Sequence, residues 1–125
     1  MYQCVLVKDA ETAMTELLER IAASGQPSPL NVLKEFGDKP SPGMLSFPRK
    51  GLTLALDFPN RGDKTLELCR ALDEVVLQAG GALYPAKDSR MPQAMFEASF
   101  PQLPAFRKHI DPAFSSSFWR RVQPA

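Results

Sequence analysis

Residues 52–58 read Leu-Thr-Leu-Ala-Leu-Asp-Phe, and this stretch decides the fold class. Leucine and phenylalanine occupy its even positions, whereas Thr53, Ala55 and Asp57 occupy the odd ones. An alternation with a period of two is typical of a β-strand whose two faces meet different surroundings. The stretch therefore predicts a strand with one apolar face beneath helices and a second face of small or polar side chains.

Three more strands and two helices are predicted around this strand. The strands cover residues 2–7, 30–36 and 83–86. Two stripes of apolar residues at helical spacing predict the helices, namely Met14, Leu17, Leu18 and Ile21 in the first and Leu66, Cys69, Leu72 and Val76 in the second. The order β-α-β-β-α-β predicts an α+β, ferredoxin-like (split βαβ) sandwich, in which an antiparallel sheet carries both helices on one face.

The remaining segments complete a single domain over residues 1–125. Asp9 and Asp63 are expected to cap the two helices, and Gly25 and the pair Gly80–Gly81 to end them. Residues 37–50 hold three prolines and two glycines and predict a long loop. After the core at 1–87, residues 88–125 form a helical extension. It has one helix starting near Pro92, another over 105–109, and an aromatic tail that is expected to dock on the domain.

Composition excludes several function classes. Fifteen Lys and Arg against fourteen Asp and Glu give a net charge of +1, so no bulk field favours nucleic acid or an acidic membrane. The sequence shows no transmembrane segment and no secretory signal. The two cysteines then favour two reduced thiols over a disulfide, and a cytoplasmic location. Two cysteines and one histidine cannot form a four-ligand zinc site, and no pattern indicates a carboxylate-rich site, which stays open, so no metal is assigned.

Two groups of residues could line a ligand site. Thr53 and Ala55 share the second face of the strand at 52–58. Lys34 and Phe36 lie two residues apart on the strand at 30–36, so they share one face of that strand and could join Thr53 and Ala55. An ordinary solvated sheet face gives the same pattern. The segment from Tyr84 through Lys87 to Arg90 follows a strand end, where Lys87 could stabilise a developing anion. A solvated turn is the alternative there.

Four segments carry a resemblance to a known family. They read SGQPSPLNVLKEFGD at 24–38, LTLALDFPN at 52–60, GGALYPAKDSR at 80–90 and HIDPAFSSSFWRRV at 109–122. In this order they resemble the C-terminal substrate domain of FAD-dependent oxidoreductases of the vanillyl-alcohol-oxidase type, nearest the decaprenylphosphoryl-ribose 2′-oxidase group. The resemblance runs from about Tyr2 to Val122.

The resemblance implies an oxidoreductase that transfers a hydride from a sugar or alcohol carbon to flavin N5. It implies that Lys87 is the cation beside the flavin, with Tyr84 in the same strand. Lys34 and Phe36 would line the substrate pocket. Thr53 stands where the close relatives have asparagine and Ala55 where they have cysteine, so the pocket wall differs. Ser117 replaces an acid near the C-terminus.

The FAD-binding domain of that family, with its phosphate-cradling loop, is absent from the 125 residues. The chain is therefore expected to need an FAD-binding domain or subunit as a partner and not to hold FAD alone. The sequence leaves open whether the chain is a short natural protein, a split subunit or a fragment. A second function also stays open, that of a stand-alone binding or assembly module that forms a homodimer through its uncovered sheet face.

Overall fold

The alternating stretch forms β3 (Gly51–Leu56), an inner strand of a four-stranded sheet, in a computed structural model that describes residues 1–123. β3 pairs antiparallel with β2 (Asn31–Phe36) on one side and with β1 (Tyr2–Leu6) on the other. The short β4 (Ala82–Leu83) pairs antiparallel with the far edge of β1. The sheet order is β2-β3-β1-β4. The predicted α+β class with an antiparallel sheet is confirmed.

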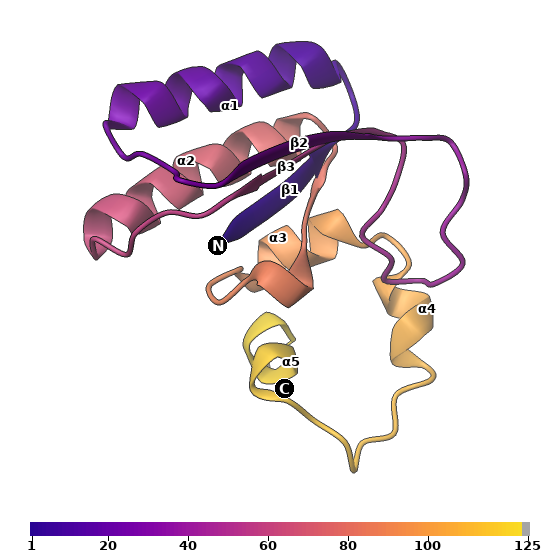
Figure 1. Cartoon of the computed structure of the whole chain (residues 1–125). Helices are drawn as coiled ribbons and strands as arrows, with labels where there is room; N and C mark the ends of the chain where they lie inside the picture. The colour runs from indigo at the N-terminus through magenta and orange to yellow at the C-terminus, as the bar shows by residue number, and fades with distance from the viewer. Residues whose placement is uncertain (124–125) are drawn as a thin grey trace.

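Two long helices pack on one face of this sheet and on each other (Figure 1). They are α1 (Ala10–Ser24) and α2 (Asp63–Gln78). Leu17 of α1 and Leu72 of α2 are fully buried against Leu54 and Leu56 of β3 in one hydrophobic core. The apolar face of residues 52–58 therefore lies beneath the helices, as its alternation predicts.

Parts of the predicted helix stripes and caps are wrong. Leu18 is 47% exposed and Leu66 is 37% exposed, because both lie at the margin of the buried helix faces. Asp9 precedes α1, but its backbone is left-handed (φ 46°) and its side chain makes no capping hydrogen bond. A capping side chain needs an extended backbone at that position. Gly62, not Asp63, precedes α2, whereas Gly25 ends α1 in the left-handed conformation as predicted.

The fourth strand is shorter than its sequence predicts. It ends at Leu83, and Pro85–Lys87 form a 3₁₀ turn, η1, in which the Lys87 N–H donates to the carbonyl of Tyr84. Proline has a fixed φ and no N–H for the strand ladder, so the chain turns at Pro85. Lys87 consequently ends a turn instead of a strand.

Three short helices form the C-terminal extension. They are α3 (Gln93–Ser99), α4 (Leu103–Arg107) and α5 (Ser117–Val122), of which α5 is absent from the sequence prediction. The ring of Phe96 on α3 contacts Phe118 and Trp119 on α5, with centroids 5.5 and 6.2 Å apart. The aromatic tail therefore docks on α3 and not on the open sheet face. No helix within residues 1–123 is long and apolar enough to cross a bilayer.

The strand register can be tested with neighbouring substitutions in β3. Leu54→Ala is expected to lower the free energy of unfolding by about 2 kcal/mol or more, because it leaves a cavity in the core. Thr53→Ala should cost about 1 kcal/mol, since the buried Thr53 hydroxyl donates a hydrogen bond to the Cys4 carbonyl at 2.7 Å. Urea unfolding of both variants gives the comparison, and equal losses would contradict the register.

Candidate functional site

The sheet face away from α1 and α2 gathers the side chains that the sequence places in a ligand site. The register pairs Lys34 with Thr53, and Thr53 with Val5. A second row on the same face begins with Val32, which pairs with Ala55, and Ala55 in turn pairs with Gln3. Tyr84 continues this row, since its N–H donates a hydrogen bond to the Gln3 carbonyl at 2.9 Å. Because side chains alternate along a strand, both rows lie on this open face.

The loop at 37–50 covers the centre of the open face, which is expected from sequence to be bare. Phe47 of this loop is buried over Val5 and Ala82. Its ring stacks on Tyr84 with centroids 4.7 Å apart and meets Phe36 edge-on at 6.1 Å. The chain therefore supplies its own cover for part of this face.

Arg49 holds the loop at 37–50 in place. Its guanidinium donates to the carbonyl of Ser99 at the end of α3 at 2.9 Å and lies 5.7 Å from the ring centroid of Phe100. It also donates to the Ser46 carbonyl at 3.3 Å. Burial lowers the pKa of Arg49 from its ordinary value. Together these contacts fix the position from which Phe47 reaches the sheet.

The cover divides the predicted site residues into two groups. Thr53 is buried with its hydroxyl already bonded, and Phe36 packs against Phe47. Lys34 is exposed on the edge strand, and Ala55 and Tyr84 are half-buried. A ligand can therefore reach Lys34 at the sheet edge and the row through Ala55, Gln3 and Tyr84, which we call the exposed row.

Lys87 lies at the end of the exposed row. It lines a cavity of about 280 Å³ that opens between the first residues of β1, the start of α2 and η1. Gln3, Tyr84 and Arg90 also line this cavity. Lys87 itself is exposed, and within residues 1–123 it forms no ion pair. Its ammonium is thus available to a ligand beside Tyr84.

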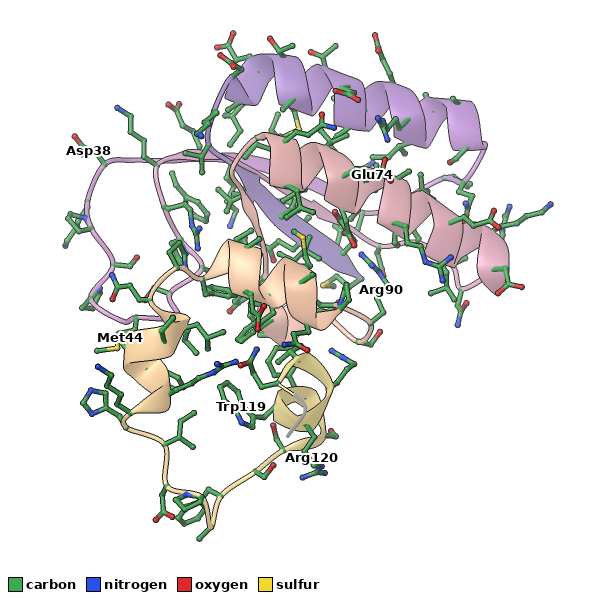
Figure 2. The ribbon with its side chains drawn as sticks, turned by 180° about the vertical axis from the view of Figure 1, so that it is seen from behind. Asp38, Met44, Glu74, Arg90, Trp119 and Arg120 are labelled. Atoms are coloured by element: carbon green, nitrogen blue, oxygen red, sulfur yellow. The ribbon has the colours of Figure 1, made fainter. Side chains whose placement is uncertain are left out.

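The residues that follow Lys87 anchor the turn to the rest of the domain. Arg90 donates two hydrogen bonds to the buried carboxylate of Asp73 on α2, each 2.7 Å long. The same carboxylate accepts a hydrogen bond from the Tyr2 hydroxyl at 3.0 Å. Burial tends to lower the pKa of Arg90, but the hydrogen bonds and charge of Asp73 outweigh this effect and raise it. Figure 2 labels Arg90 beneath α2.

Asp88 makes the second anchor. Its carboxylate accepts the backbone N–H groups of Arg90 and Met91 and an Arg121 guanidinium N–H at 2.7 Å. The Asp88 side chain is only 7% exposed. Asp88 and Arg90 therefore have structural partners, which leaves Lys87 as the side chain of this segment that faces outward with a free charge.

The cysteines offer neither a nucleophile nor a metal site. Both are buried and unpaired. Burial raises the pKa of the Cys4 thiol to about 12 and also raises that of Cys69, so both stay protonated at neutral pH. Among residues 1–123 no three metal-binding side chains of the Cys, His, Asp or Glu type come together.

Sequence reasoning misses three residues of the site. Gln3 and Val5 could have been found, since they alternate with Tyr2 and Cys4 along the first strand. Phe47 gives no such signal because it lies in an irregular proline-rich loop.

Comparison with known proteins finds relatives of this chain, and two of them match nearly its whole length. No family model matches the sequence. The chain is 37% identical over 98% of its length to decaprenylphosphoryl-β-D-ribose oxidase of Mycolicibacterium smegmatis. It is 36% identical over 97% of its length to an uncharacterised protein encoded in the mprA 5′ region of Streptomyces coelicolor. The chain is similar to part of an oxidase. It spans only 27% and 34% of the lengths of these two relatives.

Proposed function

We propose that this chain is the substrate-binding C-terminal part of an FAD-linked oxidoreductase that oxidises a sugar or alcohol carbon by hydride transfer to flavin. The observation that carries the proposal is the 37% identity to an oxidase over 98% of the chain. Partial coverage of that oxidase supports a missing partner region, which we assign to an FAD-binding domain or subunit. We also assign the core at 1–87 to the ferredoxin-like class, supported by the sheet order β2-β3-β1-β4.

The exposed row fits one side of a flavin ring. Ala55 has a small side chain, Tyr84 offers an aromatic edge that Phe47 holds by stacking, and Lys87 ends the row with a free cation. A flat surface of small and aromatic groups suits a planar ring. Within residues 1–123 no glycine-rich phosphate-binding loop lies beside this row, so we assign to this chain only the side of the site that contacts the flavin ring.

Each residue then has a role in the proposed site. Bound FAD supplies the hydride acceptor. The Lys87 ammonium stabilises negative charge beside Tyr84 as that charge develops. Lys34, exposed on the edge strand, is free to bind a substrate hydroxyl or anion. The Thr53 hydroxyl is already hydrogen-bonded, so only the methyl group of Thr53 is free for packing. Phe36 and Phe47 exclude water from the part of the open face that Phe47 covers.

The competing function is an assembly module that self-associates through the open sheet face. The coverage by Phe47 weakens it, because Val5 and Thr53 at the centre of that face are already buried in the single chain. A homodimer through this face would have to use Lys34 and the exposed row. The similarity to an oxidase supports the oxidoreductase function. No observation supports the assembly function to the same extent.

Flavin absorbance tests the proposed function. The isolated chain, dialysed after incubation with FAD, is expected to be colourless, because it lacks a phosphate-binding loop. Titrated into an FAD-binding domain of a vanillyl-alcohol-oxidase-type enzyme, it should shift the flavin spectrum, since the exposed row would cover the ring. Lys39→Ala, in the exposed loop, is a matched control that should shift the spectrum equally. A chain that stays yellow alone, or a flavin spectrum unchanged by the chain, would contradict the proposal.

A further inference from the structure

The backbone around Lys87 sets the position of its ammonium, because the Lys87 side chain has no partner of its own. The ammonium is exposed and forms no ion pair within residues 1–123. The four-carbon stem of a lysine is flexible, so contacts that fix the neighbouring backbone decide where the ammonium can lie. Asp88 and Ser89, which directly follow Lys87, make such contacts with one residue of α5, Arg121.

The Arg121 guanidinium holds Asp88 and Ser89 at the same time. One of its terminal nitrogens donates to the Asp88 carboxylate at 2.7 Å, and the other donates to the Ser89 carbonyl. The same carboxylate is buried and also accepts the Met91 N–H at 2.9 Å. A planar guanidinium can bond two neighbouring acceptors in a fixed geometry, which the single ammonium of a lysine cannot do.

The helix that carries Arg121 is itself docked on the domain. Val122 of α5 is fully buried in the main hydrophobic core. Phe118 and Trp119 of α5 contact the ring of Phe96 on α3, and Figure 1 shows α5 on the side of α3 that faces away from α1. The Arg121 guanidinium also lies 5.4 Å from the ring centroid of Phe118. The guanidinium therefore reaches the turn from a fixed position.

We infer that Arg121 is a positioning residue for Lys87. The pair of Asp73 and Arg90 fixes the segment only at Arg90, whereas Arg121 holds the two residues between Lys87 and Arg90. Arg121 does not line the cavity at Lys87, so it acts on the Lys87 ammonium through the backbone and touches no ligand there. Its effect on flavin reduction rests on the proposed function, but its effect on the turn does not.

Amide hydrogen exchange of the full chain, followed by NMR, tests the positioning directly. Arg121→Gln should speed exchange of the Met91 N–H about tenfold, because the Asp88 carboxylate that accepts it loses its charged donor. The amides of β3 report opening of the whole domain and should keep their rates. Arg120→Gln is the matched control, since the exposed Arg120 side chain bonds only the Ser115 hydroxyl within residues 1–123.

Flavin reduction tests what the positioning does once the chain is combined with an FAD-binding domain. Arg121→Gln should slow reduction at saturating substrate about tenfold, less than the loss of Lys87 itself, because the ammonium is present but misplaced. The KM for the substrate should not change, since the lost interaction belongs to the transition state. In a Lys87→Ala background, Arg121→Gln should slow the reaction no further, because Arg121 acts through Lys87.

Several results would overturn the positioning role. They are unchanged Met91 exchange in Arg121→Gln, equal acceleration at the amides of β3, and equal rate losses with and without Lys87. If the wild-type combination reduces no flavin, the proposed function fails, and Met91 exchange still decides whether Arg121 fixes the turn. Should circular dichroism show Arg121→Gln to be unfolded, Arg121→Lys replaces it and should also lose Met91 protection, because a lysine lacks the planar fork.

Discussion

Alanine in place of Asp73 is expected to lower the free energy of unfolding by about 3 kcal/mol or more. The Asp73 carboxylate accepts two hydrogen bonds from Arg90 and one from the Tyr2 hydroxyl in a largely buried site. Its removal leaves a guanidinium and a hydroxyl without their partner and away from bulk water. Urea unfolding followed by circular dichroism measures the loss.

Glu74→Ala is the matched control for Asp73→Ala. Glu74 is the next residue on α2, with a side chain 67% exposed and an ion pair to Arg20 at 3.5 Å. An exposed pair of this kind is worth less than about 1 kcal/mol. The double variant Asp73→Leu with Arg90→Met should recover much of the stability, because it removes both buried charges together. Equal losses for Asp73→Ala and Glu74→Ala would show that the Asp73–Arg90 pair does not anchor the turn.

Lys87→Ala is expected to slow flavin reduction on the order of 100-fold, about 3 kcal/mol, once the chain is combined with an FAD-binding domain. FAD bound beside Tyr84 would supply the hydride acceptor, and the Lys87 ammonium would stabilise the negative charge that develops in the transition state. Stopped-flow absorbance of the flavin measures the rate with an alcohol or sugar substrate. Because Lys87 is exposed, the same change should alter the stability of the isolated chain by less than about 0.5 kcal/mol.

Two further variants separate the charge of Lys87 from its position. Lys87→Arg should restore part of the rate, since a guanidinium keeps the charge but not the compact geometry of an ammonium. Lys39→Ala removes an exposed cation from the loop at 37–50 and should leave the rate unchanged. A normal rate in Lys87→Ala, or loss of folding in that variant, would exclude Lys87 from the flavin site.

Much of the fold and part of the candidate site follow from sequence periodicity. The alternation at 52–58 predicts which face of β3 is apolar, and Leu54 and Leu56 are buried beneath the helices accordingly. The same parity places Lys34, Phe36, Thr53 and Ala55 on one face, where the register brings them together. A period of two is a local property of an extended chain, so the amino-acid order alone is sufficient to assign faces.

Only the tertiary structure decides which of those residues a ligand can reach. Phe47 comes from an irregular loop and covers Val5 and Ala82, while Arg49 fixes that loop to the carbonyl of Ser99, 50 residues away in sequence. Asp73 and Arg90 meet across 17 residues, and Phe96 meets Phe118 between two helices of the extension. These contacts join segments that share no repeating sequence pattern. They form only when both segments are packed together in the folded chain. The sequence alone therefore determined the faces of the sheet, and packing between distant segments decided the cover of the site and the outward position of Lys87.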